Sequence, residues 1–365
     1  MCLGVCVSAC AAQPVAEGDA VQRSVERLVR EDGFPAGMVA VRSPADGSRT
    51  YTAGTAVLDV PSPVPGDGFV RMGSSTKTYV AVVVLQLVGE ERLDLDVPVE
   101  AYLPGMARGR GTDGRRATVR QLLQHTSGLP NYEDLLDTDI FARRHIHHEP
   151  RELLDTALAR KPDFLPGARW QYSNTNYILL GLLVEEVTGR SLAGEVTRRI
   201  LEPLRLRHTY FPDAGDEGIR APHPRGYHAN EPGGRLRDIT VMDPSWGWAA
   251  GAIIATPGDM NRFYTAVLDG RLLRPEQMKQ MRSTVPAPGL WPGARYGLGL
   301  ISTPLSCGGV MWGHGGSVHG YHTRCGATDD GRAATAAVTA LPAALAHGDA
   351  AADHVLALLD TALCG

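Results

Sequence analysis

Two serines and a lysine stand in front of an apolar run in the stretch RMGSSTKTYVAVVVLQLV, residues 71–88. Of the 36 cationic side chains in the chain, only those at positions 77, 161 and 279 are lysines. Arginine serves about as well as lysine as a surface charge, but guanidinium cannot lose a proton and a lysine amine can. Lys77 therefore indicates a position that needs a cation able to act as a base.

Ser74 precedes Lys77 by three residues, so a helix that begins at Ser74 would place both side chains on one face. A helix start also favours negative charge, because its first N–H groups are unpaired. Burial lowers a lysine pKa by up to about 3–5 pH units, which would let Lys77 take the Ser74 proton near neutrality. We therefore predict that Ser74 is a nucleophile activated by Lys77. Ser75, with Thr78 at the same spacing, is the weaker candidate, and a serine cap followed by a surface lysine is the alternative interpretation.

Two further patterns each occur once in the chain. WQYSNTNY places Tyr172 and Asn174 in a Tyr-x-Asn pattern, and MWGHGGSVHGY contains His314, Gly315 and Gly316. A tyrosine can relay a proton, an asparagine can bond a substrate amide, and glycines let a substrate backbone approach a strand edge. Taken singly, each pattern could instead be a core tyrosine, a helix cap or a turn.

The elements that must position these residues follow from the periodicity. Residues 19–32 have helical spacing, and the strand-like runs GMVAVRS and RTYTAGTAVL follow them. Near the C-terminus four strand-like runs, RYGLGLIST, GVMWGHGGS, GYHTRCGAT and AATAAVTAL, precede an amphipathic helix over residues 347–363. We therefore predict an α+β fold in which the two terminal segments form one antiparallel sheet flanked by helices.

The middle of the chain reads as mostly helical. The predicted helices lie in TVRQLLQHTSGL, PRELLDTALARK, NTNYILLGLLVEEVTG, SLAGEVTRRILEPL and TPGDMNRFYTAVLDG. We expect one catalytic domain over residues 19–365, with an inserted helical subregion over about residues 90–240. The active site would then lie in the cleft between sheet and helices.

Composition excludes several classes of partner. The net charge of -4 supplies no basic field for nucleic acid. No apolar run reaches the roughly 20 residues that a transmembrane helix needs, and the longest, over residues 79–88, is predicted to be a core helix. No CxxC or HExxH spacing is present, so we expect neither a metal nor another cofactor.

Residues 1–18 read as an export signal, because a short apolar stretch leads into small residues and then a polar segment. Val7-Ser8-Ala9-Cys10 also resembles a lipobox, which would make Cys10 a lipid anchor. A disordered tail without a targeting role is the alternative. We expect a secreted or extracytoplasmic protein.

Removal of that leader would leave three of the six cysteines, Cys307, Cys325 and Cys364. A bridge between Cys307 and Cys364 would attach the last helix to the sheet. Three free buried thiols remain the alternative.

Taken together, the three motifs resemble those of the serine penicillin-recognising enzymes. This superfamily holds class C β-lactamases, D-alanyl-D-alanine carboxypeptidases and related esterases, and the chain looks most similar to soluble exported carboxypeptidases. The resemblance covers about residues 20–364 and includes LLQHTSGL, YSNTNY, SWGWAAGAIIAT and YGLGL. It implies a β-lactamase/transpeptidase-like fold and a disulfide between Cys307 and Cys364.

The resemblance also implies a role for each motif residue. Ser74 would attack the substrate, Lys77 and Tyr172 would move protons, and Asn174 would hold the acyl amide. His314 would replace the lysine that many β-lactamases have at that motif.

The remaining implied residues bind the substrate. The backbone N–H groups of Ser74 and Ser317 would form the oxyanion hole, beside Gly315 and Gly316. Trp246 matches an aromatic residue that lines the substrate cleft.

Two positions depart from the family pattern. Gly315 stands where the carboxypeptidases usually have threonine. Ile301 stands where close relatives have an arginine that binds the substrate's terminal carboxylate, a strong bidentate contact. Arg324 or Arg295 could compensate, or each could be an ordinary surface arginine.

We therefore expect a serine hydrolase with an acyl-enzyme, foremost a D-Ala-D-Ala carboxypeptidase that also binds penicillin. The alternatives are a class C-like β-lactamase, an esterase or D-amino-acid amidase of the same fold, and a penicillin-binding module without turnover. The expected partners are a peptidoglycan-type peptide, a β-lactam or an ester, and the chain is expected to be a monomer.

Overall fold

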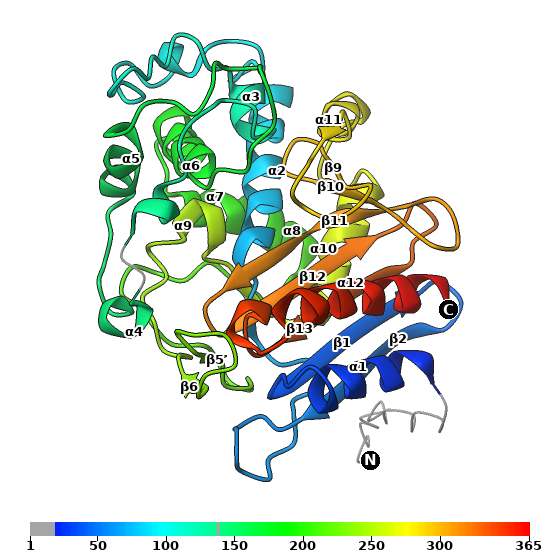
Figure 1. The fold of residues 1–365 in the computed structure, drawn as a ribbon. Helices are drawn as coiled ribbons and strands as arrows, with labels where there is room; N and C mark the ends of the chain where they lie inside the picture. The colour runs from blue at the N-terminus through cyan, green and yellow to red at the C-terminus, as the bar shows by residue number, and fades with distance from the viewer. Residues whose placement is uncertain (1–18, 137–138) are drawn as a thin grey trace, which may run out of the picture.

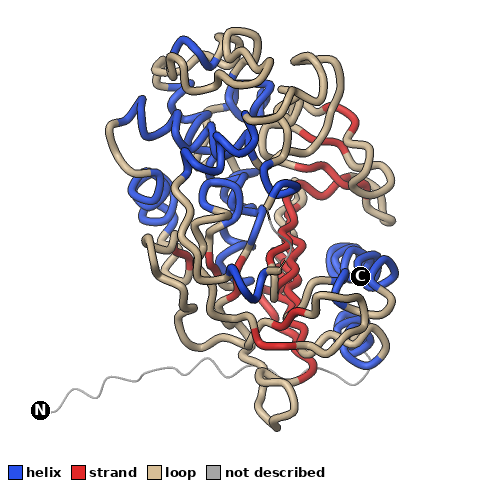
Figure 2. Tube along the Cα trace, turned by 60° about the vertical axis from the view of Figure 1, so that its left-hand side comes forward, coloured by secondary structure: helices blue, strands red, loops and turns tan. Residues whose placement is uncertain are grey.

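A central antiparallel sheet organises the molecule. The computed structural model describes residues 19–136 and 139–365, so the predicted leader with Cys10 lies outside the described residues. The sheet has eight strands in the order β2-β1-β13-β12-β11-β10-β9-β8. Helices α1 and α12 lie side by side on one face, and α10 packs on the other against β1, β12 and β13 (Figure 1). Figure 2 shows the sheet between helical layers, which confirms the α+β prediction.

The strands of this sheet come from both ends of the chain. Their bounds are β1 Ala36–Ser43, β2 Gly47–Gly54, β8 Val285–Pro286, β9 Arg295–Tyr296, β10 Ile301–Pro304, β11 Val310–Val318, β12 Tyr321–Ala327 and β13 Ala333–Val338. All six residues of β13 are buried, because the strand pairs with β1 and β12 and is covered by helices on both faces. The N- and C-terminal segments therefore close one sheet, as the sequence predicts.

Most helices also lie where the periodicity places them. The longer ones are α1 Ala20–Arg30, α2 Thr76–Gly89, α5 Pro150–Leu158, α6 Thr175–Thr188, α10 Pro257–Leu268, α11 Pro275–Met281 and α12 Gly348–Cys364. The shorter ones are α3 Val119–Leu123, α4 Ile140–Arg143, α7 Leu192–Val196, α8 Glu202–Leu204 and α9 Trp248–Gly251. Two small sheets, β3 Val70–Arg71 with β7 Ile254–Ala255 and β4 Thr209–Tyr210, and β5 Tyr227–His228 with β6 Arg237–Asp238, complete the fold.

Two predicted elements are shorter than their sequence patterns. The predicted helix in TVRQLLQHTSGL ends at Leu123, and His125 soon after it has a φ of 59°. The run RYGLGLIST is divided into β9 and β10 by a turn in which Gly299 has a φ of 71°. Left-handed backbone is incompatible with both a helix and a strand.

Helix α2 forms the core between the sheet and the helical region (Figure 1). Its buried residues include Val80, Val82, Val83 and Leu85, each fully inaccessible to solvent. A helix that is apolar all round is stable only when packed on every side, as the run over residues 79–88 predicts. Within residues 19–136 and 139–365, no helix is long and apolar enough to cross a bilayer.

Candidate active site

Ser74 lies in a 3₁₀ turn, Gly73–Ser75, that leads directly into α2. The sequence predicts that Ser74 opens the helix, whereas α2 begins at Thr76. Gly73 has a φ of 51°, and a Cβ there would lie 3.0 Å from the backbone nitrogen of Ser317. A glycine is therefore needed to bring the nucleophile turn onto strand β11.

Lys77 is fully buried and its amine lies beside the Ser74 hydroxyl. The Lys77 Nζ is 3.0 Å from Ser74 Oγ, 2.6 Å from Asn174 Oδ1 and 2.8 Å from the carbonyl oxygen of Ala250. Burial lowers the pKa of Lys77 to about 7, although the Glu133 carboxylate raises it in part. A substantial fraction of the amine is therefore neutral at pH 7 and can accept the Ser74 proton.

Asn174 connects Lys77 to an acidic residue that the sequence did not single out. Its side chain accepts the hydrogen bond from Lys77 and makes a second hydrogen bond with Glu133. Burial raises the pKa of Glu133, against the opposing effects of Lys77 and the Asn174 hydrogen bond. Glu133 lies in the turn Tyr132–Leu135, and no motif marks it in the sequence.

Tyr172 lies just before α6, with its ring centroid 4.9 Å from Lys77 Nζ. Burial raises the pKa of Tyr172 well above its ordinary value, and a hydrogen bond with the Ser74 side chain offsets only part of that rise. The residue is therefore a neutral phenol at pH 7. Among the two candidate proton carriers, Lys77 suits the role of base and Tyr172 that of relay.

His314 belongs to a buried hydrogen-bonded chain. Its Nε2 lies 2.9 Å from Tyr296 Oη, which lies 3.2 Å from His125 Nε2. The Nδ1 of His125 accepts hydrogen bonds from the backbone N–H of Ser173 and from the amide of Asn176. His125 therefore carries its proton on Nε2 and donates it to Tyr296, which donates its own to His314 Nε2.

The same chain fixes the tautomer of His314. With Nε2 accepting, Nδ1 carries the proton and donates to the carbonyl oxygen of Gly315 at 2.6 Å. Burial, reinforced by the Lys77 charge, lowers the pKa of His314 to about 3. His314 is thus a neutral side chain held in one orientation beside the Tyr172 ring, 6.4 Å between centroids.

Strand β11 approaches the nucleophile turn through Gly316. A Cβ on Gly316 would lie 1.9 Å from the carbonyl oxygen of Met72 and 2.9 Å from the backbone nitrogen of Ser74. The backbones of Ser74 and Ser317 therefore meet where an oxyanion hole would be needed. The exposed Ser317 hydroxyl is 2.9 Å from His322 Nδ1.

A pocket of about 420 Å³ opens beside this constellation. Glu133, Ser317 and Trp246 line it together with apolar side chains that include Ile140 and Leu341. Trp246 therefore lies at the cleft, where the resemblance places it.

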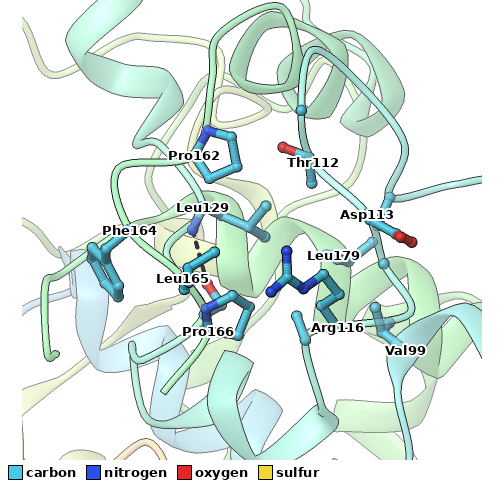
Figure 3. A pocket seen from close by; sticks show the side chains of 15 residues that line it. Val99, Thr112, Asp113, Arg116, Leu129, Pro162, Phe164, Leu165, Pro166 and Leu179 are labelled. Atoms are coloured by element: carbon cyan, nitrogen blue, oxygen red, sulfur yellow. Dashed lines mark hydrogen bonds between the residues drawn. The ribbon is translucent and has the colours of Figure 1, made fainter. Parts of the chain in front are cut away.

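A second pocket lies within the helical region, away from the predicted site residues. Figure 3 shows Phe164 and Leu165 on one side of it, with Leu179, Arg116 and Asp113 on the other. Its lining contains none of the residues that the sequence assigns to catalysis or substrate binding.

Ile301 is buried in an apolar cluster, 3% exposed, with Tyr296, Ala287 and Ala294. Tyr172 and Trp291 pack against this cluster. The position that would hold a carboxylate-binding arginine in the carboxypeptidases is therefore an apolar wall on one side of Tyr172.

The cysteines are paired as the resemblance implies. Cys307 and Cys364 form a disulfide, and Cys325 is a buried free thiol 3.7 Å from the Ser75 hydroxyl. Among the residues described, no cluster of three or more His, Cys, Asp or Glu side chains is arranged to hold a metal ion.

The β-lactamase family model matches residues 21–359, so the chain belongs to the β-lactamase family. It is a serine hydrolase of the β-lactamase fold. A solved D-stereospecific amidohydrolase from Streptomyces sp. is 38% identical, with a TM-score of 0.85 over 94% of this chain and 98% of that chain.

A D-amino acid amidase from Ochrobactrum anthropi SV3 is 25% identical, with a TM-score of 0.80 over 93% of this chain and 97% of that chain. Among curated proteins, protein flp of Staphylococcus aureus (strain MW2) is 33% identical over 144 residues, 39% of this chain. That match spans 28% of the length of protein flp.

Proposed function

We propose that this protein hydrolyses amides of D-amino acids that carry a free α-amino group, through an acyl-enzyme on Ser74. The observation that carries the acyl-transfer part is the buried Lys77 amine, 3.0 Å from the Ser74 hydroxyl and with a pKa near 7. The solved relatives named as D-stereospecific amidohydrolase and D-amino acid amidase support the D configuration and the amide bond.

The reaction follows from the contacts of Ser74. Neutral Lys77 takes the hydroxyl proton while Ser74 Oγ forms a bond to the substrate carbonyl carbon. The backbone N–H groups of Ser74 and Ser317 stabilise the oxyanion. The proton then passes through Tyr172 to the amide nitrogen as the carbon–nitrogen bond breaks, and water resolves the ester by the reverse proton path.

Glu133 supports recognition of a free amine. Its side chain lines the pocket next to Ser317 and bonds Asn174, so an ionised Glu133 would place negative charge where the acyl part of a substrate lies. An α-ammonium group there would gain a charge-assisted hydrogen bond. The same ammonium would compensate the charge that burial disfavours on Glu133.

The pocket beyond Glu133 supports a bulky apolar side chain on the acyl residue. Its apolar lining consists of Leu136, Ile140, Ile146, Trp246, Val318 and Leu341. Burying a large apolar side chain there would add about 1.5–3 kcal/mol of binding.

The test compares D-phenylalanine amide with its L enantiomer and with N-acetyl-D-phenylalanine amide. We expect hydrolysis of the first substrate alone, and a loss of about 10-fold or more in kcat/KM in Glu133→Gln, because a bond to a charged group is removed. Equal rates on the free and N-acetylated amides would refute the role of Glu133.

A D-Ala-D-Ala carboxypeptidase that binds penicillin is the second candidate, and the three sequence motifs favour it. A fluorescent penicillin should label the wild type and not Ser74→Ala. A chromogenic cephalosporin distinguishes the remaining options: steady turnover indicates a β-lactamase, and labelling without release indicates a penicillin-binding module. Equal labelling of both variants would exclude Ser74 as the nucleophile.

We also propose that the protein is exported. The disulfide between Cys307 and Cys364 supports this location, because such bonds persist in oxidising compartments. The intact mass of the exported protein would show whether the chain begins after the leader or carries lipid on Cys10.

A further inference from the structure

Arg324 lies on β12 directly opposite Gly315 on β11. A Cβ on Gly315 would lie 2.4 Å from Arg324 Nη1, so the guanidinium occupies the space above this glycine. The absence of a side chain at Gly315, one of the departures from the family pattern, therefore makes room for the Arg324 guanidinium.

The Arg324 guanidinium makes few hydrogen bonds with the described residues. Its one hydrogen bond goes to the carbonyl oxygen of its own neighbour Thr323, at 3.2 Å, and its buried Nε has no partner among the described residues. The buried Arg71, whose Nε also lacks a partner, differs because its Nη2 donates to three backbone carbonyls, those of residues 217, 240 and 242. Arg71 is held as a structural residue, whereas Arg324 keeps donors available.

Arg324 lies close enough to Tyr172 for its charge to lower the pKa of that phenol, whereas the Glu133 carboxylate raises it. The guanidinium carbon is 4.9 Å from the ring centroid of Trp291, which packs with Tyr172 on the cluster of Ile301. The Arg324 charge interacts electrostatically with both Tyr172 and His314. Burial lowers the pKa of Arg324 to about 10, so the guanidinium is charged at pH 7. Within residues 19–136 and 139–365, none of the charged groups that influence the pKa of Arg324 is a carboxylate.

We propose that Arg324 binds the terminal carboxylate of the leaving group, and that the substrates include dipeptides with an N-terminal D-residue and a free C-terminus. This inference rests on the proposed function. In this proposal Glu133 binds the free amine of the substrate and Arg324 binds its carboxylate. A guanidinium with unpaired N–H groups in a partly dry site is suited to bidentate binding of a carboxylate.

The test uses three substrates: D-phenylalanyl-glycine, D-phenylalanyl-glycinamide and D-phenylalanine amide. We expect wild type to prefer the free dipeptide over its glycinamide. Arg324→Gln should lower kcat/KM for the free dipeptide by about 10- to 100-fold and change the other two by less than about twofold, because only the first has a carboxylate. Arg324→Lys should recover part of the loss, since it keeps the charge without the fork.

Arg295→Gln is the matched control. Arg295 is exposed and its guanidinium donates to Thr284, so its removal should leave all three rates unchanged. A selective loss in Arg295→Gln, an equal loss on all three substrates in Arg324→Gln, or no loss on the free dipeptide would each overturn the proposal. If Arg324→Gln does not fold, the proposal is tested by the wild-type preference for the free dipeptide over its glycinamide and by the rates of Arg324→Lys.

Binding to Ser74→Ala separates this inference from the proposed function. If wild type fails to hydrolyse D-phenylalanine amide, the proposed function is wrong. Calorimetry with D-phenylalanyl-glycine and its glycinamide still tests Arg324: tighter binding of the free dipeptide, lost in Ser74→Ala/Arg324→Gln, supports the proposal, and equal binding of both ligands overturns it.

Discussion

At the scale of single residues, the site depends on the ionisation of Lys77. Its amine has three oxygen partners within 3.0 Å, and no carboxylate of the described residues is in contact with it. Such a site disfavours a permanent charge, because desolvation is not repaid by an adjacent anion. A neutral amine can accept a proton there, whereas a guanidinium would stay charged.

Lys77→Arg should therefore lower kcat by about 10²- to 10⁴-fold, the usual contribution of a positioned base. Lys279→Arg is the control, because Lys279 is exposed on α11. Initial rates on D-phenylalanine amide give the comparison, and circular dichroism verifies folding. Undiminished activity in a folded Lys77→Arg would show that Lys77 is not the base.

The pH profile should report the same amine. Since Lys77 must be neutral and burial lowers its pKa to about 7, kcat/KM should rise with pH through about 7. In Glu133→Gln the ascending limb should move to lower pH, because the Glu133 carboxylate raises the pKa of Lys77. Profiles of both proteins between pH 5 and 9 measure this, and a limb that stays in place would contradict the coupling.

At the scale of elements, three segments are connected by the hydrogen bonds that join His125 to Tyr296 and Tyr296 to His314. His125 follows α3, Tyr296 ends β9 and His314 lies on β11. The left-handed φ of His125 shortens the predicted helix but directs the ring into this contact. These hydrogen bonds therefore connect the helical region to strand β11.

Tyr296→Phe should leave two buried imidazole nitrogens without a partner. We expect a loss of about 1–3 kcal/mol in the free energy of unfolding, together with lower kcat, because the His314 tautomer is no longer fixed. Tyr102→Phe, a peripheral tyrosine that accepts one bond from the Asp94 backbone, is the control. Urea unfolding and kinetics test this, and full stability with full activity would exclude the proposed positioning role.

At the scale of the whole molecule, the C-terminal helix closes the fold. Helix α12 covers β13 and lies beside α1, so the two ends of the chain share one face of the sheet (Figure 1). The Cys307–Cys364 disulfide attaches the end of α12 to the segment between β10 and β11. The bridge closes a loop with a sequence separation of 57 residues.

Loss of this bridge should destabilise the protein by about 4 kcal/mol, the chain-entropy value for such a loop. The measurement is urea unfolding of Cys307→Ser/Cys364→Ser against wild type. Wild type in reducing agent should match the double variant, because Cys325 is a free thiol and forms no bridge to reduce. Identical midpoints with and without reducing agent would show that the bridge contributes no stability.

Local spacing in the sequence indicated most of the helices and the Ser74–Lys77 pair, because residues three apart in a helical turn lie together. Strand-like runs near both ends of the chain indicated the sheet. Ile301 could also be recognised from the sequence as a departure from the family pattern. Glu133 beside Asn174 and the Tyr296 hydrogen bonds carried no local signal, since each depends on residues distant in the chain.

Only the tertiary structure determines whether the Lys77 amine is neutral and whether the Arg324 donors are unpaired. A lysine pKa near 7 requires that the surrounding elements bury Lys77. The Arg324 guanidinium has room beside the neighbouring strand because Gly315 has no side chain. Residue types and spacing specify which groups are present. Desolvation and the contacts between segments determine which of them are neutral, charged or free to bind a substrate.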